Sequence, residues 1–353
     1  MWLSYLEINN IRCHGHLEAA LGRTPWVVLA GANGAGKTSL MEALYLAVRG
    51  RSFRPVSVRE IIRTGSDTAE IILTSENSGT HRLGARFTSH SRELHLDGKL
   101  VRGLAEASVA VPVEYVGSVA HRLVDGPPAD RRRFLDWGLF HVEPRFLNIW
   151  RLWHRAHRQR NEWLRRCDYP ASAGWTAAVA QHGEALSRMR SELVRRLADQ
   201  LHGDSWLKIQ GRTPRLRFNP GWRADSLLDA LQETTERERR LGRAVVGPQY
   251  DDWTLDFEGL RVGQLSRGQA KLASFFLWRE LGRMMQDAHR SAILLVDDFL
   301  ADLDEAATEQ AIAALDGAAG QVWLAVRNDR LALRLPGEAL RFHVEPGDVQ
   351  LFQ

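Results

Sequence analysis

Residues 31–39 read Gly-Ala-Asn-Gly-Ala-Gly-Lys-Thr-Ser, and this stretch decides the fold. It matches the pattern Gly-x-x-x-x-Gly-Lys-Thr in full. An apolar run from Trp26 to Ala30 precedes it, and the residues from Leu40 to Val48 have a helical composition. A buried strand, a glycine-rich loop and a helix in this order predict a phosphate-binding loop, because the turning backbone and the helix N-terminus direct N–H groups at an anion.

The side chains of the loop predict how it binds a nucleotide. Lys37 places a positive charge at the β- and γ-phosphates, and the Thr38 hydroxyl is a ligand for Mg²⁺. The other residues predicted to bind the nucleotide are Gly31, Ala32, Asn33, Gly34, Ala35, Gly36 and Ser39.

A second stretch, residues 291–304, supplies carboxylates for phosphate chemistry. It reads SAILLVDDFLADLD, so a short buried strand ends in the pair Asp297-Asp298. Acidic side chains at the carboxyl edge of such a sheet lie opposite the phosphate loop. Asp297 suits Mg²⁺, and Asp298 is the candidate to orient or deprotonate the attacking water. Lys37 and Asp298 are therefore the predicted catalytic residues.

A third stretch, Leu-Ser-Arg-Gly-Gln at 265–269, stands between the other two. Ser266 can cap the helix that follows, and the N-terminus of that helix is a second anion site. A second phosphate-binding helix end is surplus within one subunit. It has a use if two subunits pair head to tail, with Ser266, Arg267, Gly268 and Gln269 of one facing the nucleotide of the other.

The order of elements predicts an α/β fold with a largely parallel sheet, because strand–loop–helix units occur at both ends of the chain. Residues 69–116 contain several strand-like runs, with Asp97-Gly98 as a hairpin turn. We predict an ATPase core from residues 1–118 and 245–353, including a helix at 265–286. Residues 119–244 form an inserted, mainly helical, basic lobe, with helices expected near 176–201 and 225–242.

Composition places the chain among ordinary globular proteins. It has 353 residues, 44% of them hydrophobic and 25% charged. No run approaches the roughly 20 apolar residues of a membrane span, and the N-terminus does not resemble a signal peptide. Two cysteines exclude a disulfide scaffold, and Cys13, His14 and His16 have no second pair to complete a zinc site. We expect a cytoplasmic protein.

The charge is unevenly placed. The formal net charge is only +4, yet residues 131–166 hold ten arginines and three acidic residues. Arg151, Arg155 and Arg158 are spaced to share one face of a helix, opposite a tryptophan stripe. Such a face suits the phosphate backbone of DNA. A solvated helix face explains the pattern equally well, and Arg131 to Arg133 can instead be structural.

The three stretches together resemble an ABC-type ATPase head. LSRGQ is similar to the ABC signature, and Asp302-Leu303-Asp304 is similar to the D-loop that follows the paired acids. The whole chain resembles the RecF family of bacterial replication and repair proteins. The most discriminating part of that resemblance is GPPADRRRFLDWG at 126–138, which other ABC heads lack.

The sequence departs from the RecF family at one place and from many ABC heads at two more. A Gly-Pro-His-Arg-Asp segment is usual in the family, whereas this chain has Gln249 and Tyr250 in place of the His and Arg. Many ABC heads have a His near the γ-phosphate, where this chain offers Arg327 or Asn328. The second acid of the pair is Asp298 where many ABC ATPases have Glu, a feature that RecF-like proteins share, and this shorter carboxylate predicts slow hydrolysis. Arg12 is a weaker candidate for approaching the nucleotide.

The resemblance implies a function for the chain. The cofactors are ATP and Mg²⁺, ATP drives a homodimer to close on DNA at single-strand/double-strand junctions, and slow hydrolysis reopens it. The partners implied are RecR and RecO, with RecA loading downstream. One alternative stays open, a nucleotide-binding DNA scaffold with negligible turnover. Two other classes of ABC protein fit the sequence less well. A long-armed SMC protein needs a far longer insertion than this chain has, and a transporter ATPase subunit lacks a block like that at residues 126–138.

Overall fold

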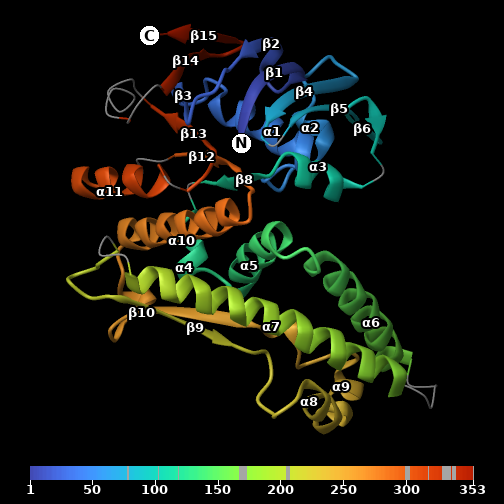
Figure 1. The fold of residues 1–353 in the computed structure, drawn as a ribbon. Coiled ribbons are helices and arrows are strands. Elements are labelled where there is room, and N and C mark those ends of the chain that lie inside the picture. Colours follow the sequence, from blue (N-terminus) through green and yellow to red (C-terminus); the bar gives the residue numbers. More distant parts are fainter. Residues whose placement is uncertain are drawn as a thin grey trace. The chain divides into compact units, whose positions relative to one another are not determined.

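The computed structural model divides the chain into two compact units (Figure 1). Unit 1 comprises Met1–Ala120 and Leu281–Gln353, and unit 2 comprises His121–Glu280. None of the described helices is long and apolar enough to cross a membrane. The residues that the structure describes are 1–77, 79–101, 103–117, 119–166, 173–203, 207–298, 303–316, 318–327, 335 and 339–352.

Unit 1 contains a six-stranded, mainly parallel sheet with the order β15-β14-β3-β13-β12-β8. The strands are β3 (Trp26–Ala30), β8 (Val113–Val116), β12 (Ile293–Val296), β13 (Gln321–Val326), β14 (Ala339–Glu345) and β15 (Asp348–Phe352). Only the β14–β15 pair is antiparallel. Every residue of β3, β12 and β13 is buried, as in a parallel sheet covered on both faces.

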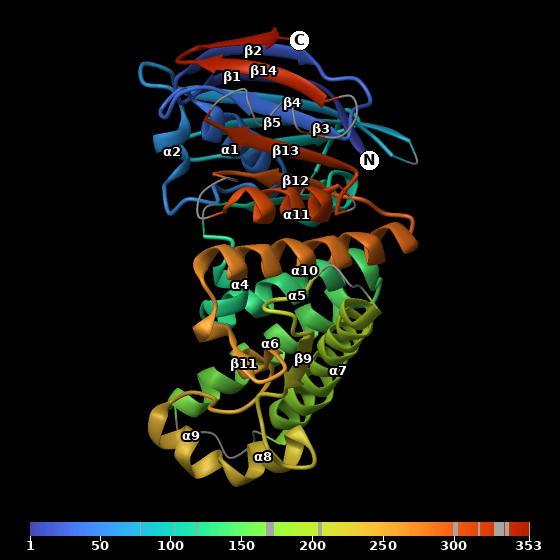
Figure 2. The same cartoon turned by 90° about the vertical axis from the view of Figure 1, so that its left-hand side faces the viewer.

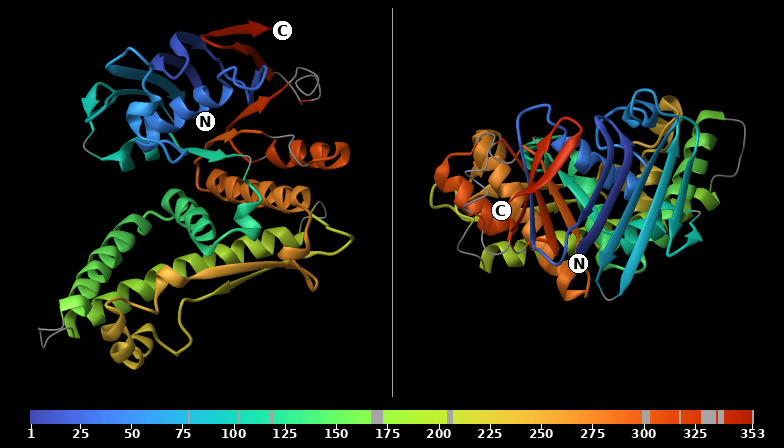
Figure 3. Two further views of the ribbon diagram at one scale, coloured as in Figure 1. Left: turned by 180° about the vertical axis from the view of Figure 1, so that it is seen from behind. Right: turned by 90° about the horizontal axis from the view of Figure 1, so that it is seen from above.

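A second sheet in unit 1 is antiparallel, with the order β2-β1-β4-β5-β6-β7 (Figure 3, blue to cyan). Its strands are β1 (Trp2–Ile11), β2 (His14–Ala20), β4 (Thr68–Glu76), β5 (Thr80–Thr88), β6 (Arg92–Leu96) and β7 (Lys99–Leu100). The largely parallel sheet expected from the strand–loop–helix units is the first sheet, whereas this second sheet is a separate, antiparallel one. Alternate residues of β4 are buried, which is typical of an antiparallel strand with one face in the core.

The predicted hairpin turn in this sheet is confirmed. Asp97 and Gly98 join β6 to β7 with φ values of 51° and 78°. Positive φ at both central residues matches the right-handed twist of a tight hairpin. In contrast, the strand-like run at 109–116 is partly helical, because α3 (Leu104–Ala110) ends inside it and the strand begins only at Val113.

Helix α1 (Lys37–Arg49) contacts strands of both sheets. All residues from Leu40 to Val48 are buried, so the helix is apolar on nearly every side. Two further helices of unit 1 are α2 (Val58–Ile61) and α11 (Glu305–Leu315). The main core of unit 1 is formed by α1 and the facing residues of the two sheets.

Unit 2 is mainly helical and contains a small antiparallel sheet (Figure 2). Its helices are α4 (Arg122–Asp125), α5 (Pro128–Val142), α6 (Phe146–Arg166), α7 (Ala173–Gly203), α8 (Leu227–Glu233) and α9 (Thr235–Leu241). The small sheet consists of β9 (Pro214–Asn219), β10 (Asp252–Phe257) and β11 (Leu260–Arg261). Two 3-10 turns, η1 (Pro248–Tyr250) and η2 (Val262–Gln264), precede α10 (Arg267–Asp287).

Two details of unit 2 differ from the sequence expectations. The single helix expected at 225–242 is two helices, because the chain leaves α8 at Thr234, whose hydroxyl donates to the carbonyl of Ala230 at 2.7 Å. The inserted lobe was expected to end at residue 244, whereas the compact unit extends to Glu280. Strand β10, which lies beyond residue 244, pairs along its whole length with β9 of this unit.

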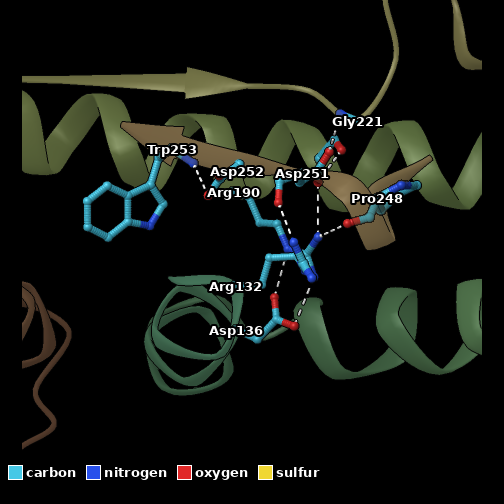
Figure 4. Close-up of polar contacts among 9 residues, drawn as sticks. Arg132, Asp136, Arg190, Gly221, Pro248, Asp251, Asp252 and Trp253 are labelled. Atoms are coloured by element: carbon cyan, nitrogen blue, oxygen red, sulfur yellow. Dashed lines mark hydrogen bonds and ion pairs between the residues drawn. The ribbon is translucent and has the colours of Figure 1, made fainter. Parts of the chain in front are cut away.

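A buried ion network joins three distant segments of unit 2 (Figure 4). The Arg190 guanidinium on α7 donates to both carboxylate oxygens of Asp136 on α5, at 2.8 and 2.9 Å. It also donates to Asp251 at 3.0 Å and to the carbonyl of Pro248 at 2.7 Å. Asp251 is fully buried and accepts from the Gly221 amide at 2.9 Å. Each charge in the network is therefore paired.

The arginine block at the start of α5 belongs to the same network. Arg131 donates to both oxygens of Asp252, at 2.6 and 2.9 Å, and Arg132 donates to the carbonyl of Asp251 at 2.9 Å. Arg133 is exposed and lies 3.8 Å from Asp130. The structural role considered for these arginines therefore applies to Arg131 and Arg132, whose partners lie within unit 2.

We predict that Arg190→Ala destabilises unit 2 by about 3–5 kcal/mol, since it leaves the buried Asp251 without its counter-charge. Chemical denaturation followed by far-UV circular dichroism measures this change. The matched control is Arg195→Ala on the same helix, where the exposed guanidinium pairs with Glu192 and Asp199. Little change is expected for that variant. Equal losses of stability in the two variants would contradict the inference that this network holds the segments of unit 2 together.

Candidate nucleotide-binding site

The glycine-rich loop connects β3 to α1 as predicted. Gly36 precedes the helix with φ of 108°, a conformation that favours glycine. A β-carbon at Gly36 would lie 2.5 Å from Nε2 of His14 and 2.8 Å from Sγ of Cys13. A β-carbon at Gly31 would clash with the backbone carbonyl oxygen of Val344. Both glycines are thus required by close packing as well as by backbone shape.

Lys37 is largely buried at the first position of α1. Its Nζ donates to the carbonyl oxygens of Gly31 and Ala32, at 2.6 and 2.8 Å. Burial lowers the pKa of Lys37, and the carboxylate of Asp297 opposes that shift. The ammonium therefore lies inside the loop, in the electrostatic field of the acids that follow β12.

The paired aspartates are at the carboxyl end of β12, as predicted. Asp298 has φ of 53°, and its amide donates to Oδ1 of Asp297 at 3.0 Å. The hydroxyl of Tyr115, at the end of the neighbouring strand β8, donates to Oδ2 of Asp297 at 3.2 Å. Burial and the charge of Asp297 raise the pKa of Tyr115, so its hydroxyl remains a donor. Both oxygens of Asp297 are therefore held in place.

These residues line one cleft of about 670 Å³ in unit 1. The cleft brings together the phosphate loop, the aspartate pair and three arginines from separate segments. Its lining residues are Arg12, Cys13, Asn33, Gly34, Gly36, Lys37, Thr38, Ser39, Arg54, Asp297, Asp298, Ala325, Val326 and Arg327. A cleft lined by one lysine, three arginines and two aspartates suits a polyphosphate accompanied by a divalent cation.

Arg12 lies in the cleft lining, where the sequence placed it as a candidate, but it is anchored to protein groups. Its guanidinium donates to both carboxylate oxygens of Glu42 on α1, at 2.9 and 3.2 Å. It also donates to the carbonyl of Glu60 at 2.6 Å. Glu42 is fully buried, so Arg12 supplies its counter-charge and ties the β1–β2 turn to the helix that carries the loop.

Several site residues were not predicted. Tyr115 was missed because a lone Tyr in an apolar strand has no pattern that indicates a site. Its ring stacks on Phe53 with centroids 3.5 Å apart, and Arg54 follows Phe53 into the cleft lining. His14, considered only for zinc, instead packs on the loop with Nε2 3.2 Å from the carbonyl of Gly36.

The signature residues lie in unit 2 and form a capping box at the start of α10. The amide of Gln269 donates to Oγ of Ser266 at 3.2 Å, and the Gln269 side chain accepts from the Ser266 amide at 3.0 Å. The predicted capping role of Ser266 is confirmed. Asp304 caps α11 in the same way, accepting from the Ala307 amide at 2.8 Å. Asp302 and Asn328 lie outside the described residues.

Gln249 and Tyr250, where the sequence departs from the expected His and Arg, make local contacts. Gln249 donates to the carbonyl of Val246 at 2.8 Å, and the Tyr250 hydroxyl donates to the carbonyl of Ala244 at 3.1 Å. The neighbouring Pro248, Asp251 and Asp252 take part in the buried ion network of unit 2. The departure therefore leaves the packing of this segment intact.

The fold is that of an ABC-type ATPase head. A family model described as an AAA domain matches residues 5–109. The fold is similar to a solved Smc head bound to the C-terminal winged-helix domain of ScpA, with a TM-score of 0.58 and 14% identity over 100% of this chain and 97% of that chain.

Sequence identity to curated proteins shows which family of ABC-type heads the chain belongs to. The chain is 34% identical to the DNA replication and repair protein RecF of Stenotrophomonas maltophilia over 91% of this chain and 92% of that protein. It is 35% identical to the RecF protein of Xanthomonas euvesicatoria over 91% of each chain. A solved structure of the recombination mediator protein RecF with ATP has a TM-score of 0.85 at 15% identity, covering 100% of this chain and 98% of that chain. The chain belongs to the RecF family.

We predict that Gly36→Ala destabilises unit 1 by about 3 kcal/mol, because the new methyl adds overpacking to an unfavourable backbone conformation. Thermal unfolding measures the change. The matched control is Gly34→Ala, where φ is 82° but no atom lies within 4 Å of the added carbon. That variant should lose only about 1 kcal/mol. A larger loss at Gly34 than at Gly36 would show that the packing of His14 and Cys13 on the loop is unimportant.

Proposed function

We propose that this protein is an ATP-dependent DNA-binding ATPase of recombinational repair and replication restart. The observation that carries the proposal is the cleft in which Lys37, Thr38 and the Asp297–Asp298 pair meet. Membership of the RecF family supports it, as does the fold shared with a solved structure of RecF with ATP from the RecFOR pathway. RecO, RecR and, downstream, RecA are the proposed partners, with junctions of single-stranded and double-stranded DNA as the site of action.

The residues in the cleft fit Mg²⁺ and ATP. The loop amides and Lys37 would bind the phosphates, and Thr38 and Asp297 would hold Mg²⁺, which would neutralise charge on the transferred phosphoryl group. Asp298 would orient or deprotonate the attacking water. Its short side chain supports the expectation of slow turnover.

The second half of the site comes from another copy of the chain. Ser266, Arg267, Gly268 and Gln269 form a capped helix N-terminus with an exposed serine, which is a ready anion site. Two copies paired head to tail would each present this helix end to the other's nucleotide. ATP would then act as the linker of a homodimer that closes on DNA.

The ATP-dependent dimer is tested by analytical ultracentrifugation with and without ATP and Mg²⁺. We expect the wild type to sediment as a dimer only with both, and Lys37→Ala to remain a monomer because it loses the charge on the phosphates. Lys208→Ala, which removes an exposed lysine of unit 2, is the matched control and should dimerise normally. A wild-type protein that remains monomeric with ATP would overturn the head-to-tail model.

Turnover is tested separately, since a DNA scaffold with negligible hydrolysis is the alternative function. We expect Asp298→Asn to abolish phosphate release in the presence of gapped DNA while the ATP-dependent dimer persists. The predicted reason is that the amide cannot accept a proton from water. A release rate unchanged by this substitution would favour the scaffold.

The contact between Tyr115 and Asp297 yields a prediction about Mg²⁺. Tyr115→Phe keeps the stack on Phe53 but removes the hydroxyl that orients the carboxylate, so Mg²⁺ affinity should fall roughly tenfold. Titration of Mg²⁺ into the protein with a fluorescent ADP analogue measures this, and nucleotide binding without Mg²⁺ should be unchanged. The control Tyr45→Phe alters the same aromatic cluster 5.6 Å from Phe53. An equal Mg²⁺ effect in both variants would refute the role of Tyr115.

A further inference from the structure

The exposed side of α6 has a hollow of about 420 Å³, which we call the α6 groove. It combines guanidinium groups with aromatic rings on a single helix, in the most basic part of the chain. Its lining residues are Trp150, Arg151, His154, Arg155, His157, Arg158, Asn161 and Arg165.

Three arginines of the groove differ from their neighbours in having no counter-charge. Arg151, Arg155 and Arg158 are exposed, and none of them forms an ion pair with a described residue. The arginines around them are paired. Arg145 is bound to Glu143, Arg160 is buried against Glu238, and Arg165 and Arg166 share Glu162. The uncompensated positive charge of α6 is therefore concentrated in the groove.

The histidines between these arginines are neutral rings. The Asn161 carbonyl oxygen accepts from the Ala244 amide at 2.8 Å, which turns the amide nitrogen of Asn161 towards Nε2 of His157 at 3.0 Å. Nε2 of His157 must then accept, so the ring carries its proton on Nδ1 alone. Burial lowers the pKa of His157 to about 4, and burial also lowers the pKa of His154.

The two histidine rings and Trp150 form an aromatic surface that packs on the buried Trp153. The rings of Trp150 and His154 lie 3.9 Å apart, and the ring of His157 stacks on the buried Trp153 at 5.0 Å. Trp150 and His154 are accessible at the groove and flank Arg151. This uncharged aromatic surface, in which the planes of Trp150 and His154 are inclined by 50°, lies beside three guanidinium groups that have no counter-charge among the described residues. It suits a ligand with both a π-face and phosphates.

We propose that the α6 groove binds an unpaired DNA strand, with phosphates on Arg151, Arg155 and Arg158 and a base stacked on the Trp150–His154 rings. The proposal rests on the proposed function, because it takes DNA to be the partner. An unpaired strand is favoured over a duplex, since a duplex offers no free base face and would leave the rings without use. The three arginines span about 10 Å of helix at 1.5 Å per residue and lie on one face of it.

Fluorescence anisotropy with a labelled oligothymidylate and a duplex of equal length tests the proposal. The double variant Trp150→Ala/His154→Ala should lose roughly tenfold in affinity for the single strand, the value expected for one stacked base, with duplex affinity unchanged. His154→Phe alone should retain wild-type binding, since it keeps the ring. Replacing Arg151, Arg155 and Arg158 with Gln should weaken the single-strand complex and reduce its dependence on salt.

The matched control is Trp175→Ala, which removes a 39% exposed tryptophan from α7 outside the groove. It should leave both affinities unchanged. The proposal is overturned if the double variant binds the single strand as the wild type does, or if it loses single-strand and duplex affinity equally. In either case, wild-type binding of duplex DNA and the ATP-dependent dimer would still stand. A wild-type protein that binds neither DNA would instead refute the proposed function itself.

Discussion

The burial of α1 between two sheets is the constraint on which the nucleotide cleft depends. Its first residue is Lys37, and from Leu40 to Val48 it has no face left for water. Such a helix can neither rotate nor shift without disturbing both sheets, so the loop before it has a fixed position. The Arg12–Glu42 pair reinforces this arrangement by anchoring the β1–β2 turn to the same helix. The rigidity of the loop is thus a property of the core of unit 1.

In unit 2 the arginines serve two physical roles. Arg131, Arg160 and Arg190 lie against carboxylates and hold segments together. Arg151, Arg155 and Arg158 stay exposed without such partners among the described residues. Burying a charge is tolerated only with a partner and hydrogen bonds. The pairing of each arginine, more than the net charge of its segment, therefore separates structural arginines from those able to meet a ligand.

The sequence predicted the elements that have strong local signals. The loop at 31–39, the capping box at Ser266 and the turn at Asp97-Gly98 each depend on residues close in the chain, and all three are as expected. The break at Thr234 was not predicted, because a threonine hydroxyl bonded to the carbonyl four residues earlier also occurs inside helices. The second, antiparallel sheet was not predicted, because strand pairing depends on distant contacts. Tyr115 was missed for the same reason. Its hydroxyl meets Asp297 only because β8 and β12 are neighbours in the sheet.

The neighbours of β3 have a consequence for how the protein is made. Both strands that pair with β3, β13 and β14, come from the last part of the chain. During translation β3 and the phosphate loop therefore leave the ribosome early. The strand β3 has no partner until β13 and β14 have been synthesised. Pairings of such high sequence separation form slowly and leave apolar strands exposed meanwhile. Prematurely terminated chains would thus lack the nucleotide cleft altogether, and the nascent protein would need protection from aggregation until its final strands emerge.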